Sequence, residues 1–215
     1  MSPSADGETD EAVASSGWSR GQWIAIAVAM AFLVGCAGYA VGVQTSKPPT
    51  NAVDIGFLQD MTDHHDQAVA MAITELANGS DKVVKDFAME VILFQRQELG
   101  RFQNFQAELG SANPEYDVDR TTMEWMDMAT PLAYMSGMAT EAQLAQLSAA
   151  RGVEADKLFL SLMQTHHVGG AHMADYEAQH GANADIRQMA DRMATNQRVE
   201  AKEYQGVLDR LAAQK

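Results

Sequence analysis

Residues 57–72 read FLQDMTDHHDQAVAMA, and residues 159–174 read FLSLMQTHHVGGAHMA. The two stretches repeat one pattern at a constant offset: a phenylalanine and a leucine, then a methionine, two adjacent histidines and a second methionine. Four of the six histidines of the chain lie in these two His-His pairs. A duplicated unit that keeps histidine and methionine while other polar positions change predicts one site assembled from both halves of the chain.

The repeat continues in the segment that follows each His-His motif. Residues 95–98 read QRQE, and residues 197–200 read QRVE, at the same offset. The repeated unit is therefore two helices long, one carrying M-x-x-H-H and its partner carrying Q-R-x-E. Two copies of a helix pair make four helices, which can enclose a single core.

Helical periodicity and helix-ending residues predict four long helices after residue 53. We expect them at about residues 54–77, 81–110, 154–180 and from Asn183 to near the C-terminus. A turn-rich crossover joins the second to the third, and Thr140 with Gln143 forms a capping box that starts a short helix within it. No strand pattern appears. The predicted fold class is all-α: a four-helix bundle built from a duplicated helix pair, preceded by one N-terminal transmembrane helix.

The N-terminal part of the chain differs in composition from the rest. Residues 1–20 are polar and acidic and predict a disordered tail. Residues 21–43 contain no charge and are just long enough to cross a bilayer as a helix, so they predict a transmembrane anchor. Residues 44–53 form a proline-containing linker, and residues 54–215 form the helical domain.

The orientation of the anchor is weakly specified, because Arg20 precedes the uncharged run and Lys47 follows it. We favour an uncleaved, single-pass anchor in the cell membrane with the helical domain on the extracytoplasmic side. A cleaved export signal is one alternative. Lipidation of Cys36 is another, since residues 33–36 resemble a lipoprotein processing site. All three place the domain outside the cytoplasmic membrane.

Charge and cysteine content exclude several classes of function. The formal net charge is −14, which argues against nucleic-acid binding because that function needs a basic face. The single cysteine rules out an internal disulfide framework. No nucleophile triad, phosphate loop or pair of catalytic carboxylates stands out, so we do not expect an enzyme.

The repeated histidines and methionines share one face of each motif helix, since residues three, four and seven apart lie together on a helix. A pseudo-symmetric bundle would bring the two faces together. The candidate metal ligands are Met61, His64, His65, Met71, Met163, His166, His167 and Met173. Thioether sulfur selects Cu(I), and imidazole suits copper, so the expected metal is copper, with Cu(I) favoured. Asp60 is matched by Leu162, so these helices repeat no carboxylate of the kind that holds iron.

Structural roles for the same residues remain open. His64 and His166 could bond to Glu or Gln of the partner helices and hold the bundle in register, and Glu98 and Glu200 could orient a histidine from outside the metal's ligand set. Gly169-Gly170 inside a helix predicts a close approach of another helix. The crossover has five methionines, which could bind Cu(I) or form an adaptable apolar flap. They are Met123, Met126, Met128, Met135 and Met138.

The doubled His-His motif and the segment YMSGMATEAQLAQLSAARG at residues 134–152 resemble the family called domain of unknown function 305. The resemblance covers about residues 54–213. It implies a ferritin-like fold and a copper role, since the family includes periplasmic copper-binding proteins, and it carries the eight candidate ligands over as copper ligands. This chain has few further histidines, which argues against a high-capacity copper store.

Three hypotheses follow. The first is a membrane-anchored, extracytoplasmic copper-binding protein for tolerance or delivery. The second is a metal-free accessory or scaffold subunit of a membrane complex, or a homo-oligomer, with Gly35, Gly38 and Gly42 as a packing face in the anchor. The third is a ferritin-like redox enzyme, which the absence of a repeated Glu-x-x-His disfavours.

Overall fold

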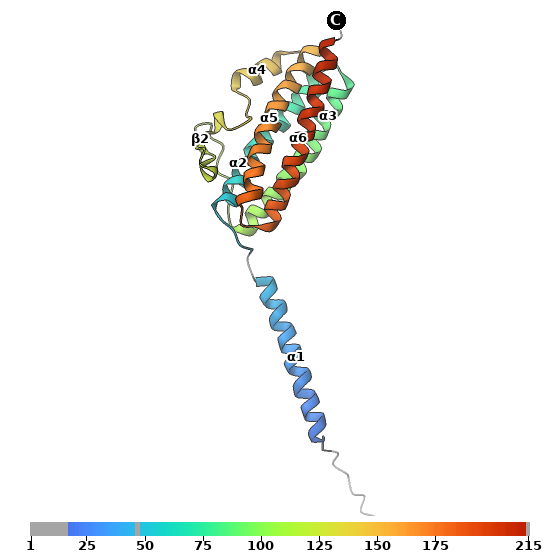
Figure 1. Ribbon diagram of the computed structural model, residues 1–215, viewed down its shortest axis with the longest axis vertical. Helices are drawn as coiled ribbons and strands as arrows, with labels where there is room; N and C mark the ends of the chain where they lie inside the picture. The colour runs from blue at the N-terminus through green and yellow to red at the C-terminus, as the bar shows by residue number, and fades with distance from the viewer. Residues whose placement is uncertain (1–16, 46–47, 214–215) are drawn as a thin grey trace, which may run out of the picture. The chain divides into compact units, whose positions relative to one another are not determined.

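The computed structural model describes residues 17–45 and 48–213. It divides into two compact units, which end and begin at Lys47 and Pro48. The N-terminal unit contains the helix α1 (Arg20–Thr45), and the second unit contains all the other elements (Figure 1). The expected disordered tail falls almost entirely on residues 1–16, outside the described residues.

Helix α1 carries a stretch, Arg20–Val43, that is long enough and apolar enough to cross a membrane, with a mean hydropathy of 2.3. Its side chains are exposed nearly throughout, which suits a helix whose apolar surface is covered by something other than its own chain. Trp23 and Tyr39 lie near its two ends, where aromatic side chains favour a membrane interface.

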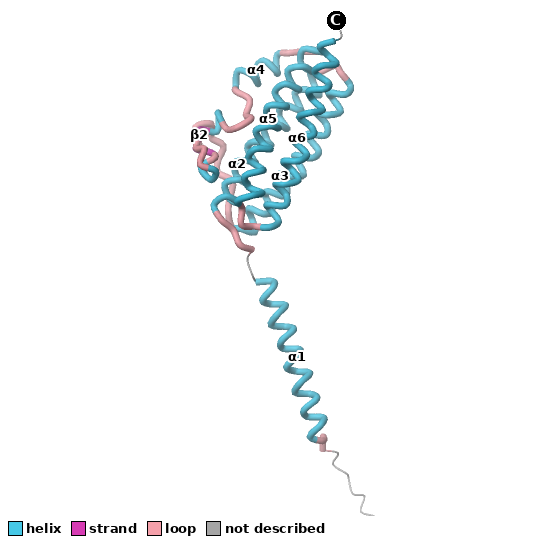
Figure 2. Tube along the Cα trace, viewed as in Figure 1, coloured by secondary structure: helices cyan, strands magenta, loops and turns pink. Residues whose placement is uncertain are grey.

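The second unit is a bundle of four long helices, and this confirms the predicted all-α class (Figures 1 and 2). The helices are α2 (Ala52–Asn78), α3 (Lys82–Leu109), α5 (Val153–His180) and α6 (Ala184–Ala213). Each repeat forms one hairpin: α2 packs on α3, and α5 packs on α6. The two motif helices, α2 and α5, pack against each other and join the hairpins.

Side-chain caps start the helices close to the predicted residues. Asn51 begins α2 in a capping box with Asp54, and Asp81 caps α3 by accepting from two backbone amides. Asn183 caps α6 in the same way, as predicted. Gly110 ends α3 in the left-handed conformation, with a φ of 68°.

The crossover between the hairpins is only partly helical. It contains β1 (Thr121–Thr122), η1 (Glu124–Met126), β2 (Thr130–Pro131), η2 (Leu132–Tyr134) and α4 (Glu141–Ala149). The predicted capping box of Thr140 and Gln143 starts α4. The prediction that the chain has no strand was wrong, because β1 and β2 pair antiparallel. Two-residue strands are too short to show an alternating pattern in the sequence.

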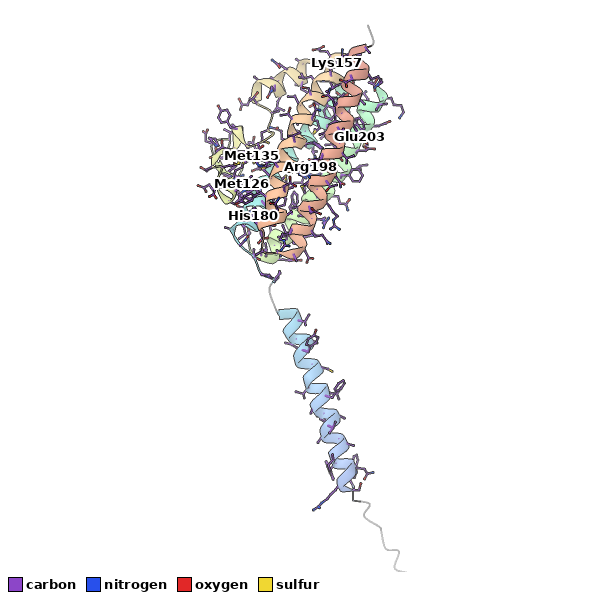
Figure 3. All side chains as sticks on the ribbon, in the orientation of Figure 1. Met126, Met135, Lys157, His180, Arg198 and Glu203 are labelled. Atoms are coloured by element: carbon purple, nitrogen blue, oxygen red, sulfur yellow. The ribbon has the colours of Figure 1, made fainter. Side chains whose placement is uncertain are left out.

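The crossover methionines mostly face the bundle. Met123, Met126 and Met135 are buried in the same apolar cluster as Phe57 on α2. Figure 3 shows Met126 and Met135 on the crossover side of the bundle. Met128, in contrast, is exposed. Met138 is partly buried against the same cluster, so four of the five crossover methionines pack as an apolar flap on the bundle.

Candidate metal centre

The centre of the bundle is a pair of stacked imidazoles, one from each repeat. His64 on α2 and His166 on α5 are fully buried, and their ring centroids lie 3.6 Å apart with planes inclined by 35°. The motif helices therefore meet at equivalent positions of the duplicated sequence. The structure brings together the first histidine of each predicted pair.

The ring nitrogens of this pair are largely without hydrogen bonds. His64 donates from Nε2 to the carbonyl oxygen of Ser136 in the crossover, over 3.2 Å. Nδ1 of His64 then carries a lone pair, and it has no partner among the described residues. Both ring nitrogens of His166 also lack a partner there. Three imidazole nitrogens are thus buried at the contact of the two repeats without a hydrogen bond.

Both central rings are neutral at pH 7. Burial lowers the pKa of His64 and of His166 well below the usual value, and the neighbouring histidines lower it further. Neutral imidazole is the form that ligates a metal.

The second histidine of each pair contacts a carboxylate on its own hairpin partner. His65 donates from Nε2 to Glu98 on α3 over 2.8 Å, and His167 donates to Glu200 on α6 over 2.7 Å. The predicted role of these two glutamates as histidine acceptors is confirmed. The alternative in which a glutamate of the partner helix bonds to His64 or His166 is not what the structure has: the next residue along each helix is rotated by about 100° and so faces the partner helix.

Two buried amides of the Q-R-x-E segments lie behind these carboxylates. Gln95 on α3 and Gln197 on α6 are 4% and 3% exposed. Oε1 of Gln95 and both amide atoms of Gln197 have no partner among the described residues. An unpaired buried polar group costs about 1–3 kcal/mol, so such a cluster calls for a bound ion or water.

Glycines allow the crossover and Gln197 to approach α5 closely. A Cβ on Gly169 would lie 2.5 Å from Cα of Gly137, and one on Gly170 would lie 2.3 Å from Oε1 of Gln197 and 2.9 Å from Cε1 of His64. The predicted close approach is confirmed. At Gly169, however, the approaching segment is the crossover backbone rather than a helix.

The four candidate methionines are buried, but they fall on two sides of the histidines. Met61 and Met173 belong to one apolar cluster, and Met71 and Met163 belong to the other. At a rise of 1.5 Å per residue, Met61 and Met163 lie about 4.5 Å along the axis from the histidine of their own helix, and Met71 and Met173 about 10 Å. One methionine of each motif, Met61 or Met163, is therefore one helical turn from the histidine of its own helix. The other, Met71 or Met173, is two helical turns away.

Carboxylates do not form a centre of their own. Within the described ranges, no group of three or more His, Cys, Asp and Glu side chains is arranged to hold a metal ion. A metal at this place would take its ligands from imidazole, thioether and amide groups. That donor set fits copper better than a hard cation such as Mg²⁺ or Ca²⁺.

Asp60 and the crossover residues that cover the histidines were missed as functional residues. Asp60 accepts from Arg120, from the backbone amide of Met123 and from Nε1 of Trp125, so it fastens the crossover to α2. The sequence carried one signal of this role: Asp60 is a carboxylate in the motif that the second copy lacks.

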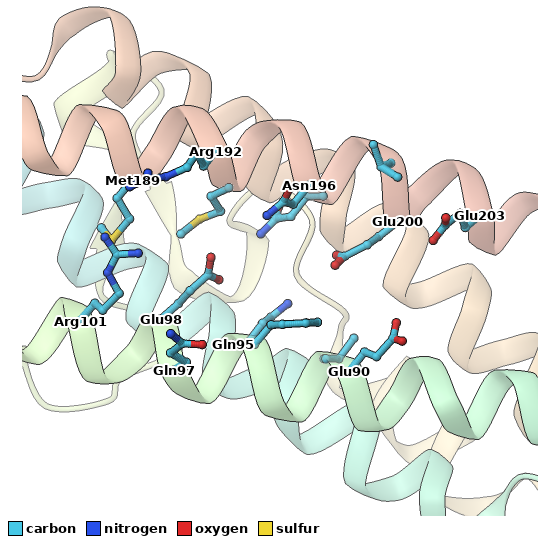
Figure 4. Close-up of a pocket in the computed structure, with 15 residues that line it drawn as sticks. Glu90, Gln95, Gln97, Glu98, Arg101, Met189, Arg192, Asn196, Glu200 and Glu203 are labelled. Carbon is cyan, nitrogen blue, oxygen red and sulfur yellow. The ribbon is translucent and has the colours of Figure 1, made fainter.

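A groove of about 500 Å³ lies between α3 and α6 (Figure 4). Gln95 and Glu98 line it from α3, and Gln197 and Glu200 line it from α6. The remaining histidines lie elsewhere. His172 is exposed on α5, and His180 stacks on Tyr176 at the end of that helix.

Comparison with known proteins identifies the family. A model described as domain of unknown function (DUF305) matches residues 54–208. DUF305 proteins of known structure from Streptomyces coelicolor and Deinococcus radiodurans are each 29% identical to the chain. The first has a TM-score of 0.67 and covers 75% of this chain and 94% of its own; the second has 0.65, 76% and 99%.

CopM in its Cu(I)-bound form shares the fold at 20% identity and a TM-score of 0.57, covering 73% of this chain and 96% of its own. No curated protein matches the chain. The family match spans most of the chain and includes both His-His motifs, all four long helices and the crossover. The protein therefore belongs to the DUF305 family.

Proposed function

We propose that this protein is a membrane-anchored, extracytoplasmic copper-binding protein that serves copper tolerance or delivery, with Cu(I) as its favoured ion. The observation that carries the proposal is the buried pair of His64 and His166, whose facing imidazoles leave three ring nitrogens without a hydrogen bond. A bound ion would satisfy the lone pair on Nδ1 of His64 and the lone pair of one His166 nitrogen, while the other His166 nitrogen carries the proton of the neutral ring.

We assign the copper ligands according to their distance from this histidine pair. His64 and His166 would bind first, and Met61 and Met163 lie one helical turn away on either side. Glu98 and Glu200 orient His65 and His167, as outer carboxylates do for metal-binding histidines. Met71 and Met173 belong to the predicted set but would need a second ion or a shift of the helices to take part.

Two further observations support the choice of copper and the proposed attachment to a membrane. CopM, which shares this fold, has Cu(I)-bound, Cu(II)-bound and Ag-bound forms, so these ions are the first to test. Helix α1 is long and apolar enough for an anchor. The motif helices repeat no Glu-x-x-His, so we expect a binding protein rather than a redox enzyme.

The test is a Cu(I) titration of the full chain in detergent against a colorimetric Cu(I) chelator. We expect tight binding by the wild type and at least a hundredfold loss of affinity in His64→Ala/His166→Ala. The matched control is His172→Ala, which removes an exposed histidine from the same helix, α5, and should leave affinity unchanged. Circular dichroism would check that each variant keeps its helices.

Weak binding that is the same in all three proteins would contradict the copper proposal. It would favour the accessory or scaffold subunit, in which the histidines only hold the bundle together. In that case the wild-type protein should copurify with a partner, and the histidine substitutions should change its thermal stability and leave its metal content unchanged.

A further inference from the structure

The buried histidine pair is closed on three sides. Helices α2 and α5 pack directly on each other. The crossover lies over the pair, since the carbonyl of Ser136 accepts from His64 and a Cβ on Gly137 would lie 2.7 Å from the carbonyl oxygen of His166. Apolar clusters fill the bundle toward both of its ends. An ion could pass none of these sides without displacing packed backbone or core.

The fourth side is the groove between α3 and α6. These helices line a cavity of about 500 Å³, and their side chains point into it from both sides (Figure 4). Glu98 and Glu200 stand at its wall, partly open to solvent, and each holds a buried histidine by its other face. Glu90 and Glu203 add two further carboxylates to the lining, and Arg101 and Arg192 add two positive charges, so negative charge still predominates.

Gln95 and Gln197 form the buried floor of the groove, and Gln197 lies next to the histidine pair. Both line the groove, both are buried, and both have unpaired amide oxygens. The position a Cβ of Gly170 would occupy lies within 3 Å of both Gln197 and His64, so this amide reaches the central imidazoles. A row of oxygen atoms thus leads inward, from solvent-facing carboxylates to buried amides and then to ring nitrogens.

We propose that the α3–α6 groove is the access route by which a copper ion enters and leaves the histidine pair, with Gln95 and Gln197 as the inner gate. This proposal rests on the proposed copper-binding function and adds the path that the ion takes to its site. Amide oxygen is a weak ligand for a soft ion such as Cu(I), so these two side chains would replace water along the path without holding the ion. The carboxylates at the wall raise the local concentration of cations.

The experiment measures rates as well as affinity. Copper-loaded full chain in detergent is mixed with excess Cu(I) chelator, and release is followed through the colour of the chelator complex. In Gln95→Leu/Gln197→Leu, apolar side chains replace the amides, so we expect release at least tenfold slower with a Kd within threefold of wild type. The matched control is Gln103→Leu, an exposed glutamine of α3 that does not line the groove.

A second pair of variants tests the route without touching the interior. Val199 lines the groove and is exposed, so Val199→Arg should fold and should slow loading by Cu(I) several-fold through charge repulsion. Val83→Arg places the same charge on an exposed site outside the groove and should not slow loading. Added salt should reduce the effect of Val199→Arg.

The outcomes separate the route from the site. Wild-type rates in both the glutamine and the Val199 variants would overturn the route while leaving a His64- and His166-dependent site in place. Faster release with a weakened Kd in the glutamine variant would also overturn it, because the amides would then be ligands rather than a gate. A wild-type protein without His-dependent copper binding would contradict the proposed function, and the route with it.

Discussion

His64 and His166 differ from the histidines that follow them in what their ring nitrogens contact. His65 and His167 each donate to a glutamate, whereas the central pair contacts only one crossover carbonyl. The repeated sequence places all four on two helices with the same spacing, but the rotation of about 100° between neighbouring residues gives them different surroundings. Glu98 and Glu200 orient His65 and His167 through Nε2 and leave Nδ1 of each ring without a partner among the described residues, whereas no carboxylate there hydrogen-bonds to His64 or His166.

Gly169 controls how closely the crossover covers this pair. A Cβ there would lie 2.5 Å from backbone atoms of Gly137 and Ser136, which cannot move aside as a flexible side chain could. We expect Gly169→Ala to lower the free energy of unfolding by about 1–3 kcal/mol, as overpacking does. Urea denaturation of the wild type and the variant would measure this difference in the free energy of unfolding.

The matched control is Gly206→Ala in α6. Its Cβ would meet nothing within 4 Å, so we expect a gain of about 0.5–1 kcal/mol from helix propensity alone. If both substitutions stabilised the protein equally, the crossover would not be pressed against α5 as the structure has it.

At the scale of the elements, each repeat is tied to the other by a buried carboxyl pair. Asp54 on α2 accepts from the backbone amides of Ala182 and Asn183 at the α5–α6 turn, and Asp156 on α5 accepts from those of Ser80 and Asp81 at the α2–α3 turn. Each motif helix therefore caps the turn of the opposite hairpin. These aspartates recur at the repeat offset, a signal that sequence reasoning missed.

A buried glutamate faces each of these aspartates, and both are protonated at neutral pH. Burial, assisted by Asp156, raises the pKa of Glu75 to about 8, and burial, assisted by the charge of Asp54, raises that of Glu177 to about 9. A carboxyl group with a raised pKa holds its proton in the folded state and loses it in the unfolded state. Stability is therefore lost as pH rises toward these values and levels off above them.

We expect the melting temperature to fall between pH 7 and 9. The raised pKa values of Glu75 and Glu177 lie in this range, so we assign the fall to these two glutamates. Glu75→Gln/Glu177→Gln replaces each protonated acid with an amide of similar shape that does not titrate, and it should flatten the profile. A double variant that falls in parallel with wild type would contradict this assignment. Calorimetry across the pH range would decide.

At the scale of the whole molecule, the chain joins a membrane-compatible helix to a bundle with its own core. A single uncleaved anchor should keep the protein in the membrane after a carbonate wash, at the full mass of the chain. A tag on the C-terminus should be removed by protease added to intact spheroplasts of a bacterial host, because we propose that the bundle lies outside.

Cys36→Ala separates the alternatives for α1. An uncleaved anchor should behave the same with and without this cysteine, whereas a lipoprotein would lose both its processing and its attachment. A shortened, soluble product in both cases would contradict the anchor and indicate a cleaved export signal. Mass spectrometry of the purified protein gives the answer directly.

The sequence by itself determined the four helices, their caps, the duplication and the candidate ligands. Helix periodicity, capping residues and a repeat are local properties, so Asn183, Asp81 and the Thr140 capping box could be placed without a structure. The duplication also predicted that the two His-His motifs would share one site, because equivalent segments of a duplicated unit can meet at the axis that relates the two copies.

Only the tertiary structure decided which residue each histidine ring contacts. It also decided which apolar cluster each methionine joins and on which side of the histidine pair the groove opens to solvent. These depend on the rotation and axial offset of α2 against α5, which no local pattern encodes. The same offset carries Met61 and Met173 into one cluster and Met71 and Met163 into the other. The groove exists because α3 and α6 each pack mainly on a motif helix and touch one another less, as at Phe87 and Tyr204.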